Sequence, residues 1–177
     1  MIKNKTVFSR ALATCKVFSV LYLFSVLLGC SSPISITKPI NISTPDQTVR
    51  AEFEVKEVGD YRFALLFAWG KDKSKMDAQS KLWGVWGENN GGTPIPIHLR
   101  IMKDDKIFFN ELILTRGTNS TFSFDYDGAR KSVQLRDIKH LTLPPGRYLV
   151  EVSTTEATEA FSETETYVKF SYYNPKI

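Results

Sequence analysis

Apolar and polar residues alternate along most of the chain after residue 48. Between Val49 and Val55, apolar side chains occupy the odd positions and charged side chains the even ones. A period of two is typical of a β-strand with one face buried and the other in water. The same pattern, or a short apolar run, predicts further strands at 95–101, 107–115, 121–126, 133–135, 148–152 and 166–173.

Two segments depart from this alternation. Residues 61–69, YRFALLFAW, are almost continuously apolar, which is typical of a central strand covered on both faces. Residues 31–48 contain prolines and many Ser, Thr and Asn residues, so we interpret them as a tether. Isoleucines at even positions between 34 and 42 predict a first edge strand within this tether.

Turn signals separate the strands, among them KDDK at 103–106 and the hairpin pair Asp127–Gly128. Eight or nine strands with almost no helical periodicity predict an all-β fold, a single antiparallel β-sandwich that is immunoglobulin-like in broad architecture. A small β-barrel is the alternative. The segment LPPGRY, 143–148, is similar to the tyrosine corner of such sandwiches, so we expect the Tyr148 hydroxyl to bond to nearby backbone.

The N-terminal segment has the pattern of a signal peptide. Four basic residues lie within the first 16 positions, and the twelve residues of 17–28 are apolar apart from serine and tyrosine. A bilayer-spanning helix needs about 20 apolar residues, so this run is too short. Leu27, Leu28, Gly29 and Cys30 resemble the lipobox of bacterial lipoproteins. The alternatives are an ordinary secreted protein with an incidental cysteine, or a short anchor that stays uncut.

The lipobox resemblance implies that cleavage between Gly29 and Cys30 makes Cys30 the first mature residue, acylated and held in a lipid bilayer. We then expect a signal peptide at 1–29, a tether at 30–48 and the β-sandwich at 49–174. Ser31, rather than an acidic residue, follows the cysteine. In a Gram-negative host this residue predicts anchoring in the outer membrane, and we expect the domain to face the periplasm.

The net charge bears on the class of partner, and the cysteine content bears on disulfide bonds. The net charge is +4, but the four basic residues of the signal peptide leave 19 basic against 19 acidic residues in the mature chain. A neutral chain does not indicate a nucleic-acid partner. The chain contains two cysteines, Cys15 and Cys30. The mature domain therefore has no internal disulfide.

The sequence contains few residues suited to catalysis. It lacks a G-x-S-x-G motif, and His98 and His140 stand alone without partners at metal-ligand spacing. Asp125 and Asp127 fit the chemistry of a hairpin turn. We therefore expect a non-enzyme without metal or cofactor. A pair of carboxylates from separate strands could still meet in space, so an envelope hydrolase stays the third hypothesis.

The segment 70–94 is the best candidate for recognition. It contains five of the ten glycines, two of the three tryptophans and a predicted short helix near 75–82. Tryptophan is favoured at binding surfaces because its large rigid ring loses little entropy on binding. The candidate partner-binding residues are Lys81, Leu82, Trp83 and Trp86. In the alternative interpretation, Leu82 and the two tryptophans cap one end of the sandwich as core.

Several of these segments resemble the lipoprotein family catalogued as domain of unknown function 5625. They are the lipobox, YRFALLFAW with the charged loop after it, GTPIPIHLRIMK at 92–103 followed by IFF, and LPPGRY. The resemblance implies an immunity lipoprotein that binds and blocks a secreted phospholipase, and it carries over no catalytic residues. The competing hypothesis is a structural or assembly lipoprotein of the envelope that docks through its sheet edges.

Overall fold

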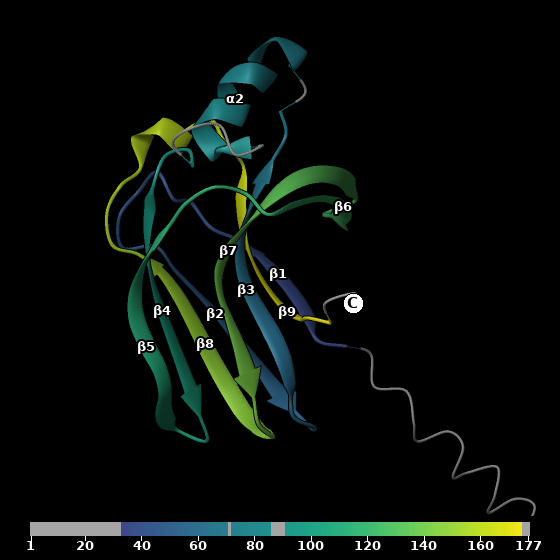
Figure 1. The fold of residues 1–177 in the computed structure, drawn as a ribbon, viewed down its shortest axis with the longest axis vertical. Coiled ribbons are helices and arrows are strands. Elements are labelled where there is room, and N and C mark those ends of the chain that lie inside the picture. Colours follow the sequence, from purple (N-terminus) through teal and green to yellow (C-terminus); the bar gives the residue numbers. More distant parts are fainter. Residues whose placement is uncertain (1–32, 71, 86–90, 175–177) are drawn as a thin grey trace, which may run out of the picture. The chain divides into compact units, whose positions relative to one another are not determined.

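The computed structural model describes residues 33–70, 72–85 and 91–174. The predicted lipobox, with Gly29 and Cys30, and the candidate residue Trp86 lie outside the described residues. From Ile34 onward the chain forms one compact unit, built as two layers of strands (Figure 1). None of the helices within the described ranges is long and apolar enough to cross a membrane.

Within the described residues, nine antiparallel strands form two sheets, so the predicted β-sandwich is confirmed and the β-barrel alternative is wrong. The five-stranded sheet has the order β1-β9-β3-β7-β6, and the four-stranded sheet has the order β2-β8-β4-β5. The strands are β1 (Ser35–Pro39), β2 (Thr48–Val55), β3 (Gly59–Ala68), β4 (Ile95–Lys103), β5 (Lys106–Thr115), β6 (Ser120–Tyr126), β7 (Ala129–Leu143), β8 (Gly146–Thr154) and β9 (Thr166–Tyr172). The expected first edge strand is β1, which pairs with β9.

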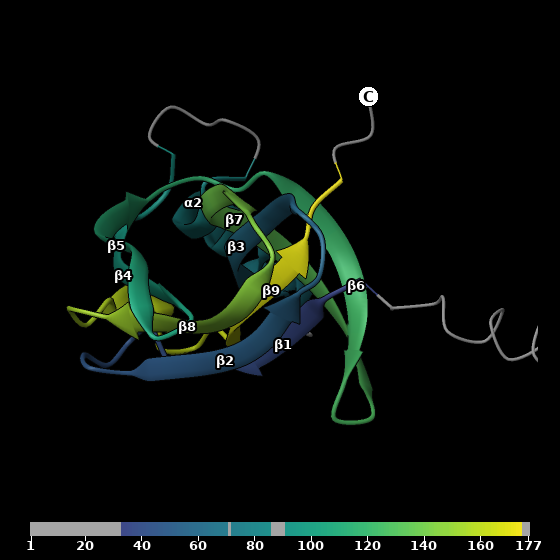
Figure 2. The ribbon, with the colours of Figure 1, turned by 90° about the horizontal axis from the view of Figure 1, so that it is seen from below.

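β3 is buried on both faces, as its sequence predicts. Phe63, Leu65 and Phe67 belong to the main core between the sheets. The intervening side chains, such as Leu66, form a second small cluster on the outer face of the five-stranded sheet, together with three aromatic residues of β6. The β6–β7 hairpin curves away from the rest of the sandwich in Figure 2. Residues 129–135 of β7 pair with β6, and residues 133–143 pair with β3.

Two turns depend on backbone with positive φ. Asp127 and Gly128 have φ values of 49° and 72°, so both central residues of the β6–β7 turn are left-handed. This is the geometry of a type I′ hairpin turn, which Asp-Gly favours. Asp104 and Asp105 in the predicted KDDK turn between β4 and β5 also have positive φ. Both predicted turns are confirmed.

The predicted tyrosine corner is present at the start of β8. The Tyr148 hydroxyl donates a hydrogen bond of 2.7 Å to the Pro144 carbonyl. The ring is buried and stacks at 5.8 Å on Phe53 of β2. Burial raises the pKa of the Tyr148 phenol, and the nearby Asp104 carboxylate adds to the shift. This bond therefore fixes the turn that brings the chain from β7 in one sheet to β8 in the other.

In the part of the chain that the structure describes, helical structure is restricted to short connections. The predicted helix is α2 (Met76–Trp83), preceded by the 3-10 turn η1 (Lys73–Lys75). A second 3-10 turn, η3 (Glu159–Phe161), lies between β8 and β9. These connections cross one end of the sandwich in Figure 1 and close its core there.

Candidate partner-binding surface

Trp83, predicted as a partner-binding residue, lies in the core. Its side chain is fully buried, stacks at 5.7 Å on Phe67 and lies 4.4 Å from the ring of Trp69. A side chain in this position cannot contact a partner, so this part of the prediction is wrong. The alternative interpretation, in which the helix caps one end of the core, is confirmed for Trp83. Leu82 is half-buried against the same core, and Lys81 is exposed.

Arg136 on β7 fixes this end of the fold. Its buried guanidinium donates hydrogen bonds to four main-chain carbonyls: 2.8 Å to Trp83, 2.8 Å to Thr93, 2.6 Å to Gly117 and 3.5 Å to Thr115. These carbonyls belong to the end of α2, the approach to β4, and the end of β5 with the connection that follows it. The guanidinium therefore joins three chain segments that lie far apart in sequence.

The Arg136 guanidinium is held by carbonyl dipoles rather than by a carboxylate. Within the described residues it takes part in no ion pair. Burial lowers its pKa to about 10, and repulsion from Arg116 acts in the same direction. At neutral pH it stays protonated, with its donors satisfied by carbonyls. We interpret Arg136 as a structural anchor of α2 and of the C-terminal end of β5.

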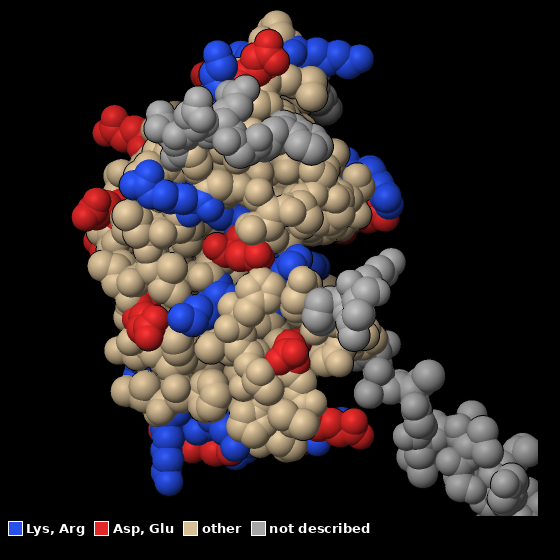
Figure 3. Space-filling model, in the orientation of Figure 1, with Lys and Arg blue, Asp and Glu red and all other residues tan. Residues whose placement is uncertain are grey.

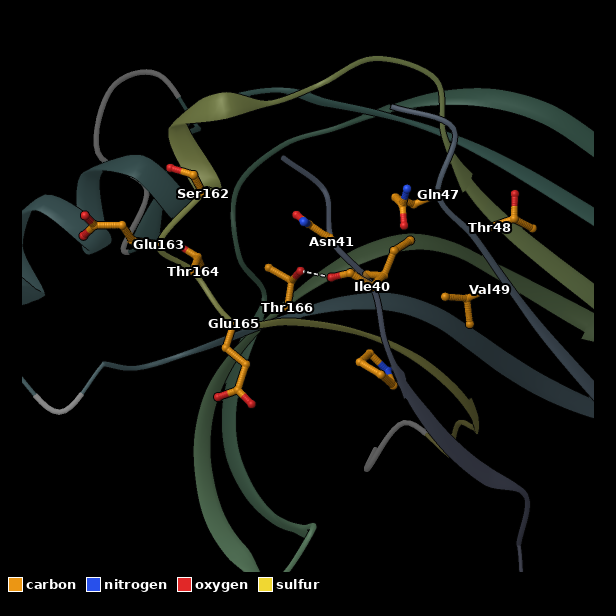
Figure 4. Close-up of a pocket in the computed structure, with 11 residues that line it drawn as sticks. Ile40, Asn41, Gln47, Thr48, Val49, Ser162, Glu163, Thr164, Glu165 and Thr166 are labelled. Atoms are coloured by element: carbon orange, nitrogen blue, oxygen red, sulfur yellow. Dashed lines mark hydrogen bonds between the residues drawn. The ribbon is translucent and has the colours of Figure 1, made fainter. Parts of the chain in front are cut away.

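A polar hollow of about 510 Å³ lies beside β1 and β2 (Figure 4). Residues 39–41, 47–49 and 162–166 line it. Its carboxylates form ion pairs with lysines: Glu163 with Lys75 at 2.8 Å, and Glu165 with Lys131 at 2.8 Å. Burial raises the pKa of Glu165, but hydrogen bonds from Lys131 and Tyr167 outweigh it and make the net shift downward. Glu165 is thus held ionised, which does not suit a general acid.

The two histidines lie in different sheets. His98 is on β4, half-buried and opposite Leu112 of β5. His140 is on β7, where its Nε2 lies 3.1 Å from Asp137, and Asp137 also pairs with Arg62 at 3.2 Å. Among the described residues, no group of three or more His, Cys, Asp or Glu side chains could hold a metal ion. The arrangement does not bring the two histidines into one site.

The outer face of the four-stranded sheet is divided into two halves. On the β2 side, Glu151 of β8 lies between Arg50 of β2 and Arg100 of β4, with N–O distances of 2.6 and 3.1 Å. The three residues are neighbours in the strand register. This half of the face is therefore an ion-pair ladder, with its charges satisfied within the sheet.

The β5 half of the same face presents apolar side chains to solvent. Ile107, Leu112 and Leu114 are 63%, 64% and 56% exposed. Figure 3 shows mostly uncharged residues over β4 and β5, with a few separate acidic and basic side chains. Contiguous exposed apolar surface is common at interaction sites. We call Ile107, Leu112 and Leu114 the β5 apolar row.

The sequence did not indicate the β5 apolar row as a site. IFFNELILT, 107–115, predicts a strand, but its composition gives no sign that its leucines stay exposed. They are exposed because β5 is an edge strand that pairs only with β4, and the chain places no described element over that side of the sheet. Only the strand order in three dimensions identifies this surface.

Fold and surface together define a two-sheet β-sandwich with an arginine-anchored helical cap and an apolar edge strand. The chain belongs to the family described as Domain of unknown function (DUF5625), whose model matches residues 37–172. The suspected resemblance to this family is therefore confirmed.

One solved structure supports the fold, and two others are more distant matches. A crystal structure of a protein from Sulfurospirillum deleyianum has a TM-score of 0.63 and 20% identity, covering 82% of this chain and 100% of that one. A family 35 carbohydrate-binding module from Clostridium thermocellum is more distant, with a TM-score of 0.33 and 14% identity over 79% of this chain and 98% of that one. A Paenibacillus cycloisomaltooligosaccharide glucanotransferase has a TM-score of 0.33 and 12% identity, covering 81% of this chain and 17% of that one. No curated protein matches the chain.

Proposed function

We propose that this protein is a membrane-anchored lipoprotein whose β-sandwich binds a protein partner and performs no catalysis. The observation that carries the proposal is the β5 apolar row, Ile107, Leu112 and Leu114, each more than half exposed. Burying apolar area is the main driving force of protein association. The row replaces Trp83 as the predicted contact surface.

The partner we favour is a secreted phospholipase, with this protein acting as its immunity protein in the periplasm. An inhibitor needs only a rigid scaffold with an exposed binding surface. A lipid anchor raises its effective concentration at the membrane that such an enzyme attacks. The second candidate is an assembly lipoprotein of the envelope, which the unpaired edge of β5 favours equally, because sheet edges are common docking points.

The anchor itself rests on the lipobox resemblance at Leu27 to Cys30. Two or three acyl chains on Cys30 would hold the protein on the outer membrane, because each buried methylene contributes about 0.8 kcal/mol. In the Cys30→Ala variant we expect loss of labelling with a clickable fatty acid and accumulation of the unprocessed chain. A Cys30→Ala chain that is still acylated and membrane-held would show that the anchor lies elsewhere.

Partner capture tests the binding surface. The full chain with a C-terminal tag is purified from detergent-solubilised envelopes, incubated with envelope and secreted fractions, and its retained proteins are identified by mass spectrometry. The Leu112→Lys/Leu114→Glu variant gives β5 the charges of an ordinary edge strand and is the test variant. Glu52→Thr/Glu54→Thr, on the opposite edge of the same sheet, is the matched control.

We expect the β5 variant to retain at least tenfold less partner than the wild-type chain, and the β2 control to retain the wild-type amount. If the partner is a lipase whose activity falls on binding, the immunity role is supported. If only resident envelope proteins are retained, the assembly role is supported. Equal retention by both variants would show that the β5 apolar row is not the binding surface.

A further inference from the structure

β5 has one strand neighbour among the described residues. It pairs with β4 through nine of its ten residues, and its other edge faces away from the sheet. In an antiparallel strand, the N–H and C=O of one residue point to the same side, and those of the next residue point to the other side. The main-chain groups that face the free edge can therefore be identified from the hydrogen bonds of the neighbouring strands.

The hydrogen bonds of Thr154 in β8 show which side its main-chain groups face. Its N–H donates to the Gln47 carbonyl, and its C=O accepts from the Asp46 N–H, so its main chain faces the β2 side. The residues that alternate with it, 153, 151 and 149, then face β4. Their partners in β4 are 98, 100 and 102, which face β8. The hydrogen bond from the Asp104 N–H to the Arg147 carbonyl agrees with this assignment.

The other β4 residues, 97, 99 and 101, therefore face β5, where they pair with 113, 111 and 109. The residues between these, Asn110, Leu112 and Leu114, direct their N–H and C=O groups to the free edge. Leu112 and Leu114 also have exposed side chains on the outer face. One row of residues thus offers both main-chain hydrogen bonds and apolar contact.

We propose that β5 binds an extended segment of the partner protein as an additional strand, through the free main-chain groups of Asn110, Leu112 and Leu114. This inference rests on the proposed function and specifies how the partner binds. Main-chain hydrogen bonds provide the affinity in such strand addition, and alternate side chains provide the specificity. The partner segment must present apolar side chains beside the two leucines.

The charges at the ends of β5 define the partner segment further. Lys106 begins the strand, and Arg116 follows its last residue. Both are exposed, whereas Arg100 of β4, opposite Asn110, is already paired with Glu151. The strand therefore exposes apolar side chains at Leu112 and Leu114 and one basic side chain at each end, although the acidic Asp104 and Asp105 precede Lys106. A complementary segment has apolar residues in its middle and acidic residues at its ends.

The same charges disfavour a second copy of this chain as the occupant. Two β5 strands aligned antiparallel over their full length would place Lys106 of one copy opposite Arg116 of the other. Glu111, near the centre, would lie opposite itself. Like charges directly opposite one another destabilise a strand pair. A lipid surface is also a poor occupant, because it offers no ordered row of donors and acceptors to the three main chains.

Proline substitution tests strand addition directly. In Asn110→Pro, the lost N–H points to the free edge, so the sheet itself loses no hydrogen bond. Asn110→Ala removes the side chain and keeps the N–H. Glu52→Pro is the matched control, because β2 is the other edge of the sheet and the Arg50 carbonyl, two residues before, faces outward to accept from Lys38.

The probe is a ten-residue peptide of alternating valine and threonine with an aspartate at each end, added to the full chain in detergent micelles. Amide hydrogen exchange is followed by NMR at single residues. We expect exchange at Asn110, Leu112 and Leu114 to slow at least tenfold, and exchange at the outward-facing amides of β2 to stay unchanged. Slowing should persist in the Asn110→Ala and Glu52→Pro chains and disappear in Asn110→Pro.

Absence of slowing at the three amides, equal slowing on β2, or slowing by anionic vesicles alone would overturn strand addition. A doubling of the mass of the chain that Asn110→Pro abolishes would overturn it in favour of a second copy. Partner capture gives a further test. If the Asn110→Pro chain retains the partner and the Leu112→Lys/Leu114→Glu chain loses it, strand addition is overturned and the proposed function is left intact. Retention by both variants would overturn the proposed surface as well.

Discussion

The two edge strands of the four-stranded sheet, β2 and β5, have different surfaces. The outward-facing side chains of β2 include Arg50, Glu52 and Glu54, and the Arg50 carbonyl accepts a 2.7 Å hydrogen bond from Lys38. β5, of similar length, has Leu112 and Leu114 at the comparable positions. Charges and side-chain cover are the usual protection of an edge strand against unwanted pairing.

β2 has this protection along its outward-facing side. On β5, Glu111 forms an ion pair of 3.6 Å with Lys139 of β7, but the outward-facing residues Leu112 and Leu114 carry no charge of their own. A domain that protects one edge and leaves the other apolar retains the exposed edge for a reason other than stability. Binding a partner is the reason that fits both the exposed leucines and the free main-chain groups. The comparison therefore separates positions that maintain the fold from positions that serve binding, and each substitution below tests this separation.

The largest expected effect is on stability, at the anchor of β5 and α2. Arg136→Met leaves the carbonyls of Trp83, Thr93, Thr115 and Gly117 without this donor, and the bonds lost at Trp83 and Thr115 are buried. We expect a loss of about 3 kcal/mol in the free energy of unfolding, measured by urea denaturation, since each orphaned buried group costs about 1–3 kcal/mol. An unchanged or higher midpoint would show that removing the buried charge outweighs the lost hydrogen bonds.

Giving β5 the charges of β2 should remove binding without removing stability. For Leu112→Lys/Leu114→Glu we expect at least a tenfold loss of partner retention, which is about 1.4 kcal/mol. Because both side chains are more than half exposed, the midpoint of urea denaturation should change by less than about 0.5 kcal/mol. A large loss of stability together with binding would mean that the leucines serve the fold.

Tyr148→Phe tests a position that serves the fold alone. Loss of the bond to the Pro144 carbonyl should cost about 1 kcal/mol and leave partner retention unchanged. Burial raises the pKa of the phenol, so the folded state keeps its proton more tightly than the unfolded state does. This contribution to stability is complete below a pH of about 10 and falls at higher pH. The variant should lose less stability than the wild type in this range.

The smallest expected effect is in the ion-pair ladder. Glu151→Gln removes the carboxylate between Arg50 and Arg100, whose own side chains are 70% and 39% exposed. Solvent screens such pairs, so we expect a loss of about 0.5–1 kcal/mol by urea denaturation, and less in high salt. Partner retention should stay at the wild-type level. A binding defect here would extend the interface across the whole face.

The strands and turns could be predicted because their signals are local. The alternation at 49–55, the apolar run at 61–69 and the Asp127–Gly128 pair each determine their own geometry, and each is confirmed. The tyrosine corner is likewise contained within six residues, 143–148. Short-range patterns of this kind need no knowledge of strand order.

The roles of Trp83 and Arg136 could not be predicted, because they depend on distant partners. In the sequence Trp83 resembles a recognition residue, and only the structure shows that it packs against Phe67 and Trp69. Arg136 alternates with Leu135 and therefore resembles a solvent-facing residue. In this region Val133 and Leu135 of β7 face the small outer cluster, and the buried Arg136 faces the interior between the sheets. The exposure of β5 depends on strand order in the same way.

In vivo photo-crosslinking tests the central claim, that the partner binds at β5, most directly. The photoreactive amino acid p-benzoylphenylalanine replaces Leu114 in one strain and Glu52 in another, and the tagged chain is recovered after irradiation. We predict a partner adduct from position 114 and none from position 52. An adduct from position 52 alone, or none from position 114, would contradict the assignment of the β5 edge as the partner-binding surface.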